Sequence, residues 1–152
     1  MLGQTLLLPR LFGRVLIPLA VAKELQKVPI GQTTLDEASR AGWLEVRTVV
    51  NLRMVAELSQ ELDGGESEAI ALASEMGISL LLIDEADGRA AALSRGLEVV
   101  GVGGVLVRAK AQGLLPLVRP SLDWLMTHTS YRLHRDVYAQ VLRLADELDP
   151  LP

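Results

Sequence analysis

The chain has 152 residues, enough for one domain with a substantial hydrophobic core. Apolar residues make up 49% and aromatic residues 3%, so Leu, Val and Ala must fill the interior, and the formal net charge of −4 does not by itself indicate nucleic-acid binding. Because the chain has no Cys, disulfides and thiolate metal sites are excluded. No apolar stretch approaches the roughly 20 residues that span a bilayer, and no secretory leader is recognisable. We therefore expect one cytoplasmic domain over residues 1–152, with no membrane partner.

Strand signals and helix signals alternate along the whole chain. The apolar run Val15–Ile17 ends at Pro18, a residue suited to the first turn of a helix. Pro29–Gly31 is expected to end that helix, and Thr34 with Glu37 forms a capping-box pattern for the next one. The predicted strands are 15–17, 43–50, 78–83 and 97–100. The predicted helices are 18–28, 34–40, 53–62, 66–76, 87–95, 103–112, 121–127 and 135–148. Strands separated by helices predict an α/β fold with a parallel sheet.

Three carboxylates, Glu24, Glu66 and Asp84, stand where such a fold brings acids towards one edge of a sheet. Asp84 directly follows the most apolar predicted strand, and ligands of open parallel sheets bind beyond the carboxyl ends of the strands. Its alternative role is to cap the next helix, with Asp87 three residues on. Asp87 is a second candidate ligand. Convergent carboxylates without soft ligands suit a hard divalent cation such as Mg²⁺ or Mn²⁺.

Glu66 and Glu24 each have a structural alternative. At 100° per residue, Glu66 shares a helix face with Ile70 and Ala73, and an inward acid is costly unless it is paired, neutralised or bound to metal. Asp63 and Glu66 are also spaced as a capping box, and acids in a first turn are favoured by the helix dipole. Glu24 flanks an apolar stripe, with lysines nearby that could form a surface ion pair.

Basic residues dominate the stretch from Gly88 to Arg135. It contains seven of them against the acids Glu98 and Asp123. Such an asymmetry could place a basic flank beside an acidic pocket, as phosphate-backbone ligands require, although a solvated face is the ordinary meaning of such a run. Arg89, one turn after Asp84, is a candidate phosphate contact. The seven are Arg89, Arg95, Arg108, Lys110, Arg119, Arg132 and Arg135.

The order of these motifs resembles that of PIN-domain proteins, in a prokaryotic branch known as a domain of unknown function. The segments Gly65–Ile70 and Leu82–Glu85 are the more specific ones, and the resemblance covers most of the chain. It is carried by Leu11–Pro18, Val21–Leu25, Leu62–Ala73, Leu81–Glu85, Gly88–Arg89, Gly96–Leu97, Gly101–Leu106 and Ala109–Lys110.

This resemblance implies a three-layer α/β/α sandwich and a Mg²⁺- or Mn²⁺-dependent ribonuclease site of about four acids. Glu24, Glu66 and Asp84 match the second, third and fourth acid, and Glu68 and Asp87 are auxiliary candidates. Arg89 and Lys110 are the candidate contacts to RNA. Many relatives are toxins of toxin–antitoxin pairs, so an antitoxin protein is a further expected partner.

The chain departs from the family's pattern at its start. The first acid of the family is an Asp that ends an N-terminal strand, whereas Met1–Gln4 resembles the end of the helix after it. We expect that the start lies upstream or that the protein is truncated. Since the family's sheet order is 3-2-1-4-5, the missing strand is the central one, and unpaired backbone groups cost about 1–3 kcal/mol each. We expect a second copy to close the gap, hence a homodimer or higher oligomer.

Two other functions stay open. A non-catalytic binding module for nucleic acid or protein is favoured by the missing Asp. A small-molecule phosphate enzyme would use Gly101–Gly104, but the third glycine of that fingerprint is absent. The apolar stripes Leu122–Met126 and Val137–Leu148 predict C-terminal helices whose apolar faces, Val141 and Leu144 included, pack on the core or on a partner subunit.

Overall fold

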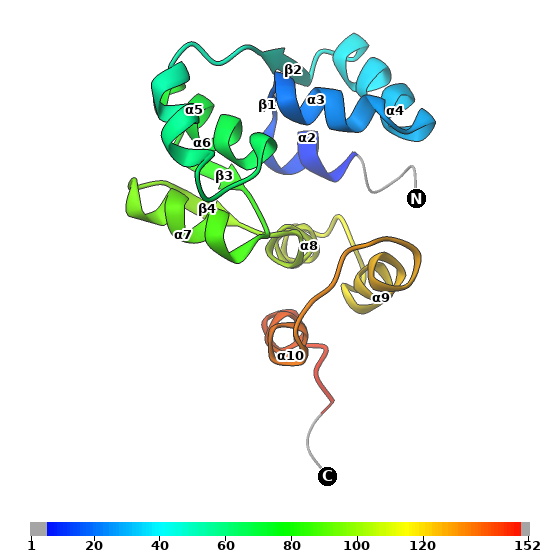
Figure 1. Cartoon of the computed structure of the whole chain (residues 1–152). Helices are drawn as coiled ribbons and strands as arrows, with labels where there is room; N and C mark the ends of the chain where they lie inside the picture. The colour runs from blue at the N-terminus through cyan, green and yellow to red at the C-terminus, as the bar shows by residue number, and fades with distance from the viewer. Residues whose placement is uncertain (1–5, 150–152) are drawn as a thin grey trace. The chain divides into compact units, whose positions relative to one another are not determined.

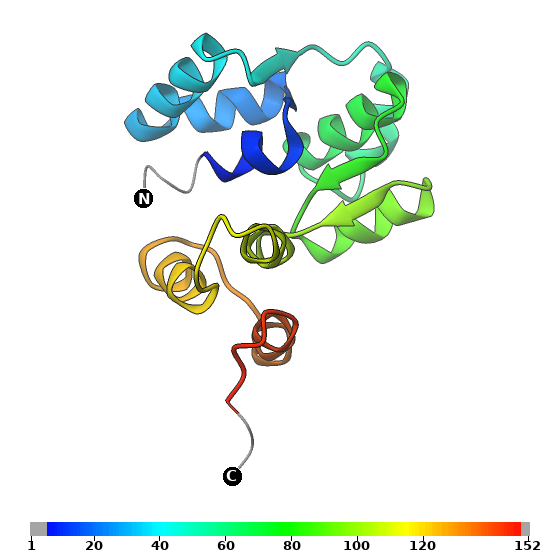
Figure 2. The ribbon, with the colours of Figure 1, turned by 180° about the vertical axis from the view of Figure 1, so that it is seen from behind.

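The computed structural model describes residues 6–149, which group into two compact units divided after Val99, here called unit 1 (6–99) and unit 2 (100–149). Figure 1 shows the elements in chain order, and Figure 2 shows them from behind. Unit 1 contains α2 (Leu7–Phe12), β1 (Val15–Pro18), α3 (Leu19–Gln26), α4 (Pro29–Arg40), β2 (Leu44–Arg47), α5 (Leu52–Leu58), α6 (Gly64–Met76), β3 (Leu80–Leu82), α7 (Ala86–Ser94) and β4 (Glu98–Val100). Unit 2 begins at Val100 and contains α8 (Val102–Ala111), α9 (Arg119–His128) and α10 (Arg135–Leu144).

Short parallel strands and helices alternate through unit 1, which confirms the predicted α/β class. β1 pairs with β2 in parallel, with Val15 opposite Leu44 and Pro18 opposite Arg47. β3 pairs with β4 in a second two-stranded sheet. Among residues 6–149 no strand joins the two sheets, so β1 and β3 are not paired with each other. The predicted end of a first helix at Met1–Gln4 lies outside the described residues.

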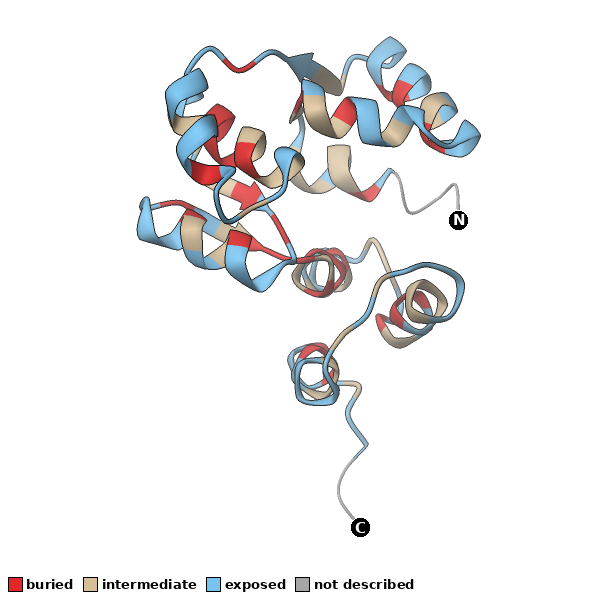
Figure 3. Ribbon diagram, in the orientation of Figure 1, coloured by how far each residue is buried: buried red, intermediate tan, exposed pale blue. Residues whose placement is uncertain are grey.

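Helix α6 contacts both β1 and β3, and its apolar residues fill the core of unit 1 (Figure 3). Ile70 and Ala73 belong to a cluster with Leu58, Leu81, Ile83, Ala92 and Leu97. Ala71 and Leu72 form a second cluster with Val49, against which Leu16 packs. The helix begins at Asp63, whose carboxylate accepts the Glu66 N–H, and ends at the left-handed Gly77. Both boundaries follow from local sequence, which explains why this helix was predicted within two residues.

The joint between α3 and α4 corrects the sequence prediction. Pro29–Gly31 was expected to end a helix, but α4 starts at Pro29 and runs to Arg40. Proline is favoured in a first helical turn, and the extended Val28 before it sets the bend. Gly31 lies at the inside of this bend, where an added Cβ would stand 2.1 Å from the carbonyl oxygen of Leu25. The two helices can meet here because Gly31 has no side chain.

Other element boundaries differ by less. The strand expected at 43–50 is paired only over Leu44–Arg47, and the helix expected at 53–62 ends at Leu58. α10 ends at Leu144 rather than at residue 148. The short helix α2 was not predicted. None of the helices within residues 6–149 has the length and apolar character that crossing a membrane requires.

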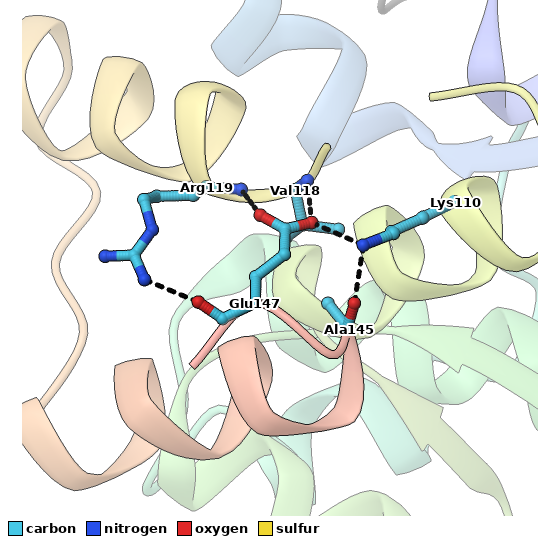
Figure 4. A network of polar contacts seen from close by, with 5 residues as sticks. All are labelled: Lys110, Val118, Arg119, Ala145 and Glu147. Carbon is cyan, nitrogen blue, oxygen red and sulfur yellow. Dashed lines mark hydrogen bonds and ion pairs between the residues drawn. The ribbon is translucent and has the colours of Figure 1, made fainter. Parts of the chain in front are cut away.

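Unit 2 is held together by close packing and by one buried carboxylate. Gly103 of α8 faces Val141 of α10, and a Cβ on Gly103 would stand 2.7 Å from a Val141 methyl group. The predicted burial of Val141 is therefore confirmed at 7% exposure, whereas Leu144 is 62% exposed and does not pack on the core of this chain, so that its packing on a partner subunit stays a prediction. Beyond α10, Asp146 takes a left-handed conformation (φ 55°), and Glu147 enters the network of Figure 4.

Candidate acidic site

Glu66 is the acid most strongly shaped by its surroundings. The side chain of Asp63 caps the helix by accepting the Glu66 N–H at 2.8 Å, as the capping-box alternative expects. The Glu66 carboxylate is half-buried, and its Oε1 atom is buried with no hydrogen-bond partner among the described residues. The pKa of Glu66 is raised, first by burial and then by the negative charges of Asp63, Glu85 and Asp87. A hydrogen bond from the Asp63 backbone lowers it, but by less. An unpartnered, partly desolvated carboxylate oxygen is costly without a proton or a cation.

Gly88 of α7 forms the wall beside this carboxylate. A Cβ on Gly88 would stand 2.7 Å from Glu66 Oε1 and 2.5 Å from the Ile83 Cδ1 methyl. The absence of a side chain therefore lets the Glu66 carboxylate lie against α7. The first turn of that helix also carries Asp87, and Glu85 is its N-cap residue. The structure thus gathers Glu66, Glu85 and Asp87 into one region of negative charge.

Asp84 lies just past β3, at the carboxyl end of that strand, as predicted. Its side chain is exposed. The N-cap residue of α7 is Glu85, which makes no side-chain capping bond, so Asp84 lies one residue before the position that its alternative role requires. Asp84 therefore stands at the edge where a ligand of this sheet would bind.

Glu24 and Glu68 each make one contact that bears on their candidate roles. Glu24 is exposed on α3, and its Oε1 accepts from Lys27 Nζ at 2.6 Å, the surface ion pair weighed as its alternative role. Glu68 Oε2 accepts the Ala20 N–H at 2.8 Å, across 48 residues of sequence. Glu68 thereby ties α6 to the first turn of α3, the helix that carries Glu24.

The two basic candidates have different surroundings. Arg89 is half-buried on α7, next to Gly88. Lys110 belongs to unit 2, where its ammonium donates to the Ala145 carbonyl at 2.6 Å and to Glu147 Oε1 at 3.0 Å. Lys110 therefore has a structural use within its own unit, and contact of either residue with RNA stays a prediction.

The carboxylates of this site are the type of ligand that a hard cation prefers, but few of them lie together. Within residues 6–149, no group of three or more His, Cys, Asp or Glu side chains could hold a metal ion. Mg²⁺, however, keeps several waters and is commonly held by one or two carboxylates plus substrate phosphate. The unpartnered Oε1 of Glu66 beside Asp87 fits that open mode. It does not fit a closed cage made of protein ligands alone.

Two residues of this site were missed or undervalued in the sequence. Glu85 was not a candidate, and Gly88 entered only through the resemblance. The pair Asp87–Gly88 inside a predicted helix was the available signal, since a glycine in a helix interior costs about 1 kcal/mol relative to alanine and so indicates close approach by another group.

Comparison with known proteins gives one match. A family model described as a PIN domain, DUF3368, matches residues 1–147. No curated protein and no solved structure matched the chain. The matched residues include every acid described above.

Proposed function

The chain belongs to the PIN-domain family, and from this premise we propose that it is a divalent-metal-dependent endoribonuclease. Members of this family are in general nuclease-like. The observation that carries the proposal is the Glu66 carboxylate, half-buried, unpartnered at Oε1 and raised in pKa beside Asp87. RNA in the cytoplasm is the proposed substrate.

The chain's own residues have distinct parts in this proposal. Glu66 and Asp87 would hold a Mg²⁺ or Mn²⁺ ion, and Asp84, at the end of β3, would contact a water of that ion rather than the ion itself. When bound, such an ion supplies an activated water and neutralises the leaving oxygen of the phosphodiester. Gly88 keeps the Glu66 carboxylate in position, and Glu68 fixes the start of α3. Glu24 could join the set only by releasing Lys27.

Asp84→Ala tests the proposal directly. We expect it to lower the rate of RNA cleavage in Mn²⁺ by about 100-fold or more, because one metal or water ligand is worth several kcal/mol in a transition state. Glu37→Ala, which removes an exposed acid of α4, is the matched control and should cleave like the wild type. Equal rates for the wild-type and Asp84→Ala proteins would refute the nuclease assignment, and EDTA should abolish the activity in all three.

Gly88→Ala tests the wall beside Glu66. Its methyl group must displace the Glu66 carboxylate and the Ile83 side chain, both of them flexible ends, so we expect a stability change below about 1 kcal/mol. Cleavage should fall about 10- to 100-fold, since a misplacement of about 1 Å can have that effect. Gly65→Ala is the control, because its added methyl meets neighbours only at 3.5 Å. Wild-type activity in Gly88→Ala would show that the position of Glu66 is unimportant.

A non-catalytic binding module is the second candidate function. It is favoured by the incomplete metal-ligand set within residues 6–149 and by the ion pair that occupies Glu24. Titration calorimetry with Mn²⁺ at millimolar concentration separates the two candidates. Heat of binding that disappears in Glu66→Gln supports the nuclease, and no heat at all supports the binding module.

The expected protein partners are part of the same proposal. A toxin role with a cognate antitoxin follows from the family resemblance alone. Self-association has a structural argument, because β1 and β3 each have one edge that pairs with no other described strand. Light scattering on the purified chain measures it, and a stable monomer would contradict the expected homodimer.

A further inference from the structure

Unit 2 carries most of the aromatic residues of this chain. Three of the chain's five Phe, Trp and Tyr residues, and both of its His residues, fall in the range from Trp124 to Tyr138. The proposed metal site uses none of them. Their side chains are exposed or half-exposed rather than buried in a core.

The rings of Trp124 and His128 are stacked face to face on α9. Their ring centroids are 4.7 Å apart and their planes differ by 5°. His128 Nδ1 lies 3.0 Å from the Trp124 carbonyl oxygen, which fixes the imidazole over the indole. A local pair of this kind stabilises a helix by only a few tenths of a kcal/mol, so helix stability alone gives little reason for a half-buried Trp124 stacked on an exposed His128.

Arginines stand beside this pair. Arg132 folds back on the end of α9, where its Nη1 donates to the carbonyls of Met126 and Thr129 at 2.8 and 2.7 Å. These bonds hold the side chain of the exposed Arg132 against the last turn of α9. On α10, the Tyr138 hydroxyl donates to the Asp123 carboxylate of α9, so the two helices meet next to Trp124. Arg135 lies one turn before Tyr138 on the same side of α10 and is exposed.

We propose that Trp124 and His128 form a stacking platform for an unpaired base of single-stranded RNA, with Arg132 and Arg135 contacting the flanking phosphates. Sequence-specific and non-specific binders of single strands both stack bases on aromatic rings beside basic side chains. The choice of RNA rests on the proposed function, whereas the platform itself rests on the geometry of unit 2. Two acids lie in the same region, Asp123 bonded to the Tyr138 hydroxyl and Asp136 beside His134, and the two arginines must outweigh their charge.

Tryptophan fluorescence measures the binding of RNA at Trp124 under conditions in which RNA is not cleaved. In Trp43→Phe, Trp124 is the sole tryptophan of the full chain. A single-stranded RNA of about 12 nucleotides, added in EDTA at low salt, should quench its emission strongly, because a stacked base contacts the indole face. Inorganic polyphosphate, which has the charge but no bases, should not. RNA that binds by anisotropy without quenching Trp124 would overturn the proposal.

Substitutions then separate stacking from charge. Trp124→Ala should weaken RNA binding about 5- to 150-fold, and Trp124→Phe should restore most of it, provided that circular dichroism shows folded protein. Arg135→Ala should reduce the slope of log affinity against log salt by about 0.7, the value for one phosphate contact on a single strand. Unchanged affinity in Trp124→Ala would overturn the platform, and tighter binding of DNA of the same sequence would overturn the assignment to RNA.

These outcomes are independent of catalysis. If RNA quenches the Trp124 fluorescence but is not cleaved in Mn²⁺, the platform is supported and the nuclease assignment is refuted. If RNA is cleaved without quenching of Trp124, the nuclease assignment is supported and the platform is refuted.

Discussion

Replacing Gly31 by alanine is expected to lower the free energy of unfolding by about 3 kcal/mol, the upper range for overpacking a tight site. The added Cβ would stand 2.1 Å from the carbonyl oxygen of Leu25 and 2.9 Å from its carbon. Both belong to the backbone of α3, so no side-chain rotation can relieve the contact. The bend between α3 and α4 must open instead.

Gly64→Ala is the matched control for this change. Gly64 lies in the first turn of α6, where an added Cβ meets nothing within 4 Å. Alanine should therefore be neutral or slightly stabilising there, by up to about 1 kcal/mol. Urea unfolding followed by circular dichroism measures both variants. If Gly31→Ala falls within about 0.5 kcal/mol of Gly64→Ala, the close approach of the two helices is not as described.

The joint at Gly31 also shows what local sequence cannot decide. Proline, isoleucine and glycine in a row form a turn signal, and α4 nevertheless begins there, because proline suits a first turn and glycine permits a contact with Leu25. The strands were found more readily. Apolar runs bounded by Pro18 or by glycine define β1, β3 and β4 locally, and parallel pairing follows from the helices between them.

The candidate site was predicted in outline and not in detail. Helical periodicity placed Glu66 on the inward face, and the end of an apolar strand placed Asp84 at a ligand-binding edge. The capping-box spacing of Asp63 and Glu66 indicated the start of α6, but periodicity could not say that Gly88, 22 residues beyond Glu66, would lie against the Glu66 carboxylate. That contact is a tertiary one. The same holds for Glu24, whose exposure and pairing with Lys27 a spacing argument leaves undecided.

Glu147 was missed entirely because its partners are distant in sequence. Its carboxylate accepts from Lys110, Val118 and Arg119, which are 37, 29 and 28 residues away. The left-handed turn at Asp146 ends α10 early and brings Glu147 to these donors. An apolar stripe that continues to Leu148 gave no sign of this break.

Replacing Glu147 by alanine is expected to cost about 2–4 kcal/mol of unfolding free energy, because it leaves buried donors without an acceptor. The Glu147 side chain is only 7% exposed. It accepts the Val118 N–H at 2.6 Å, the Arg119 N–H at 2.8 Å and Lys110 Nζ at 3.0 Å, as Figure 4 shows. Asp149→Ala is the control. That acid lies 3.8 Å from Arg119 but is 94% exposed, so its loss should change stability by less than about 0.5 kcal/mol.

The same contacts fix how stability depends on pH. Burial, the largest single influence, raises the pKa of Glu147, but the hydrogen bonds from Val118 and Arg119 and the Lys110 ammonium outweigh it, and the pKa lies below its ordinary value of 4.5. A carboxyl with a lowered pKa in the folded state stabilises the protein above its unfolded pKa, and that stabilisation is lost as the pH falls through the folded pKa. Wild-type protein should therefore exceed Glu147→Gln in melting temperature at pH 7, and the difference should shrink below about pH 4.5. A difference that grows on acidification would mean that the charged carboxylate is not what holds Lys110 and the start of α9 in place.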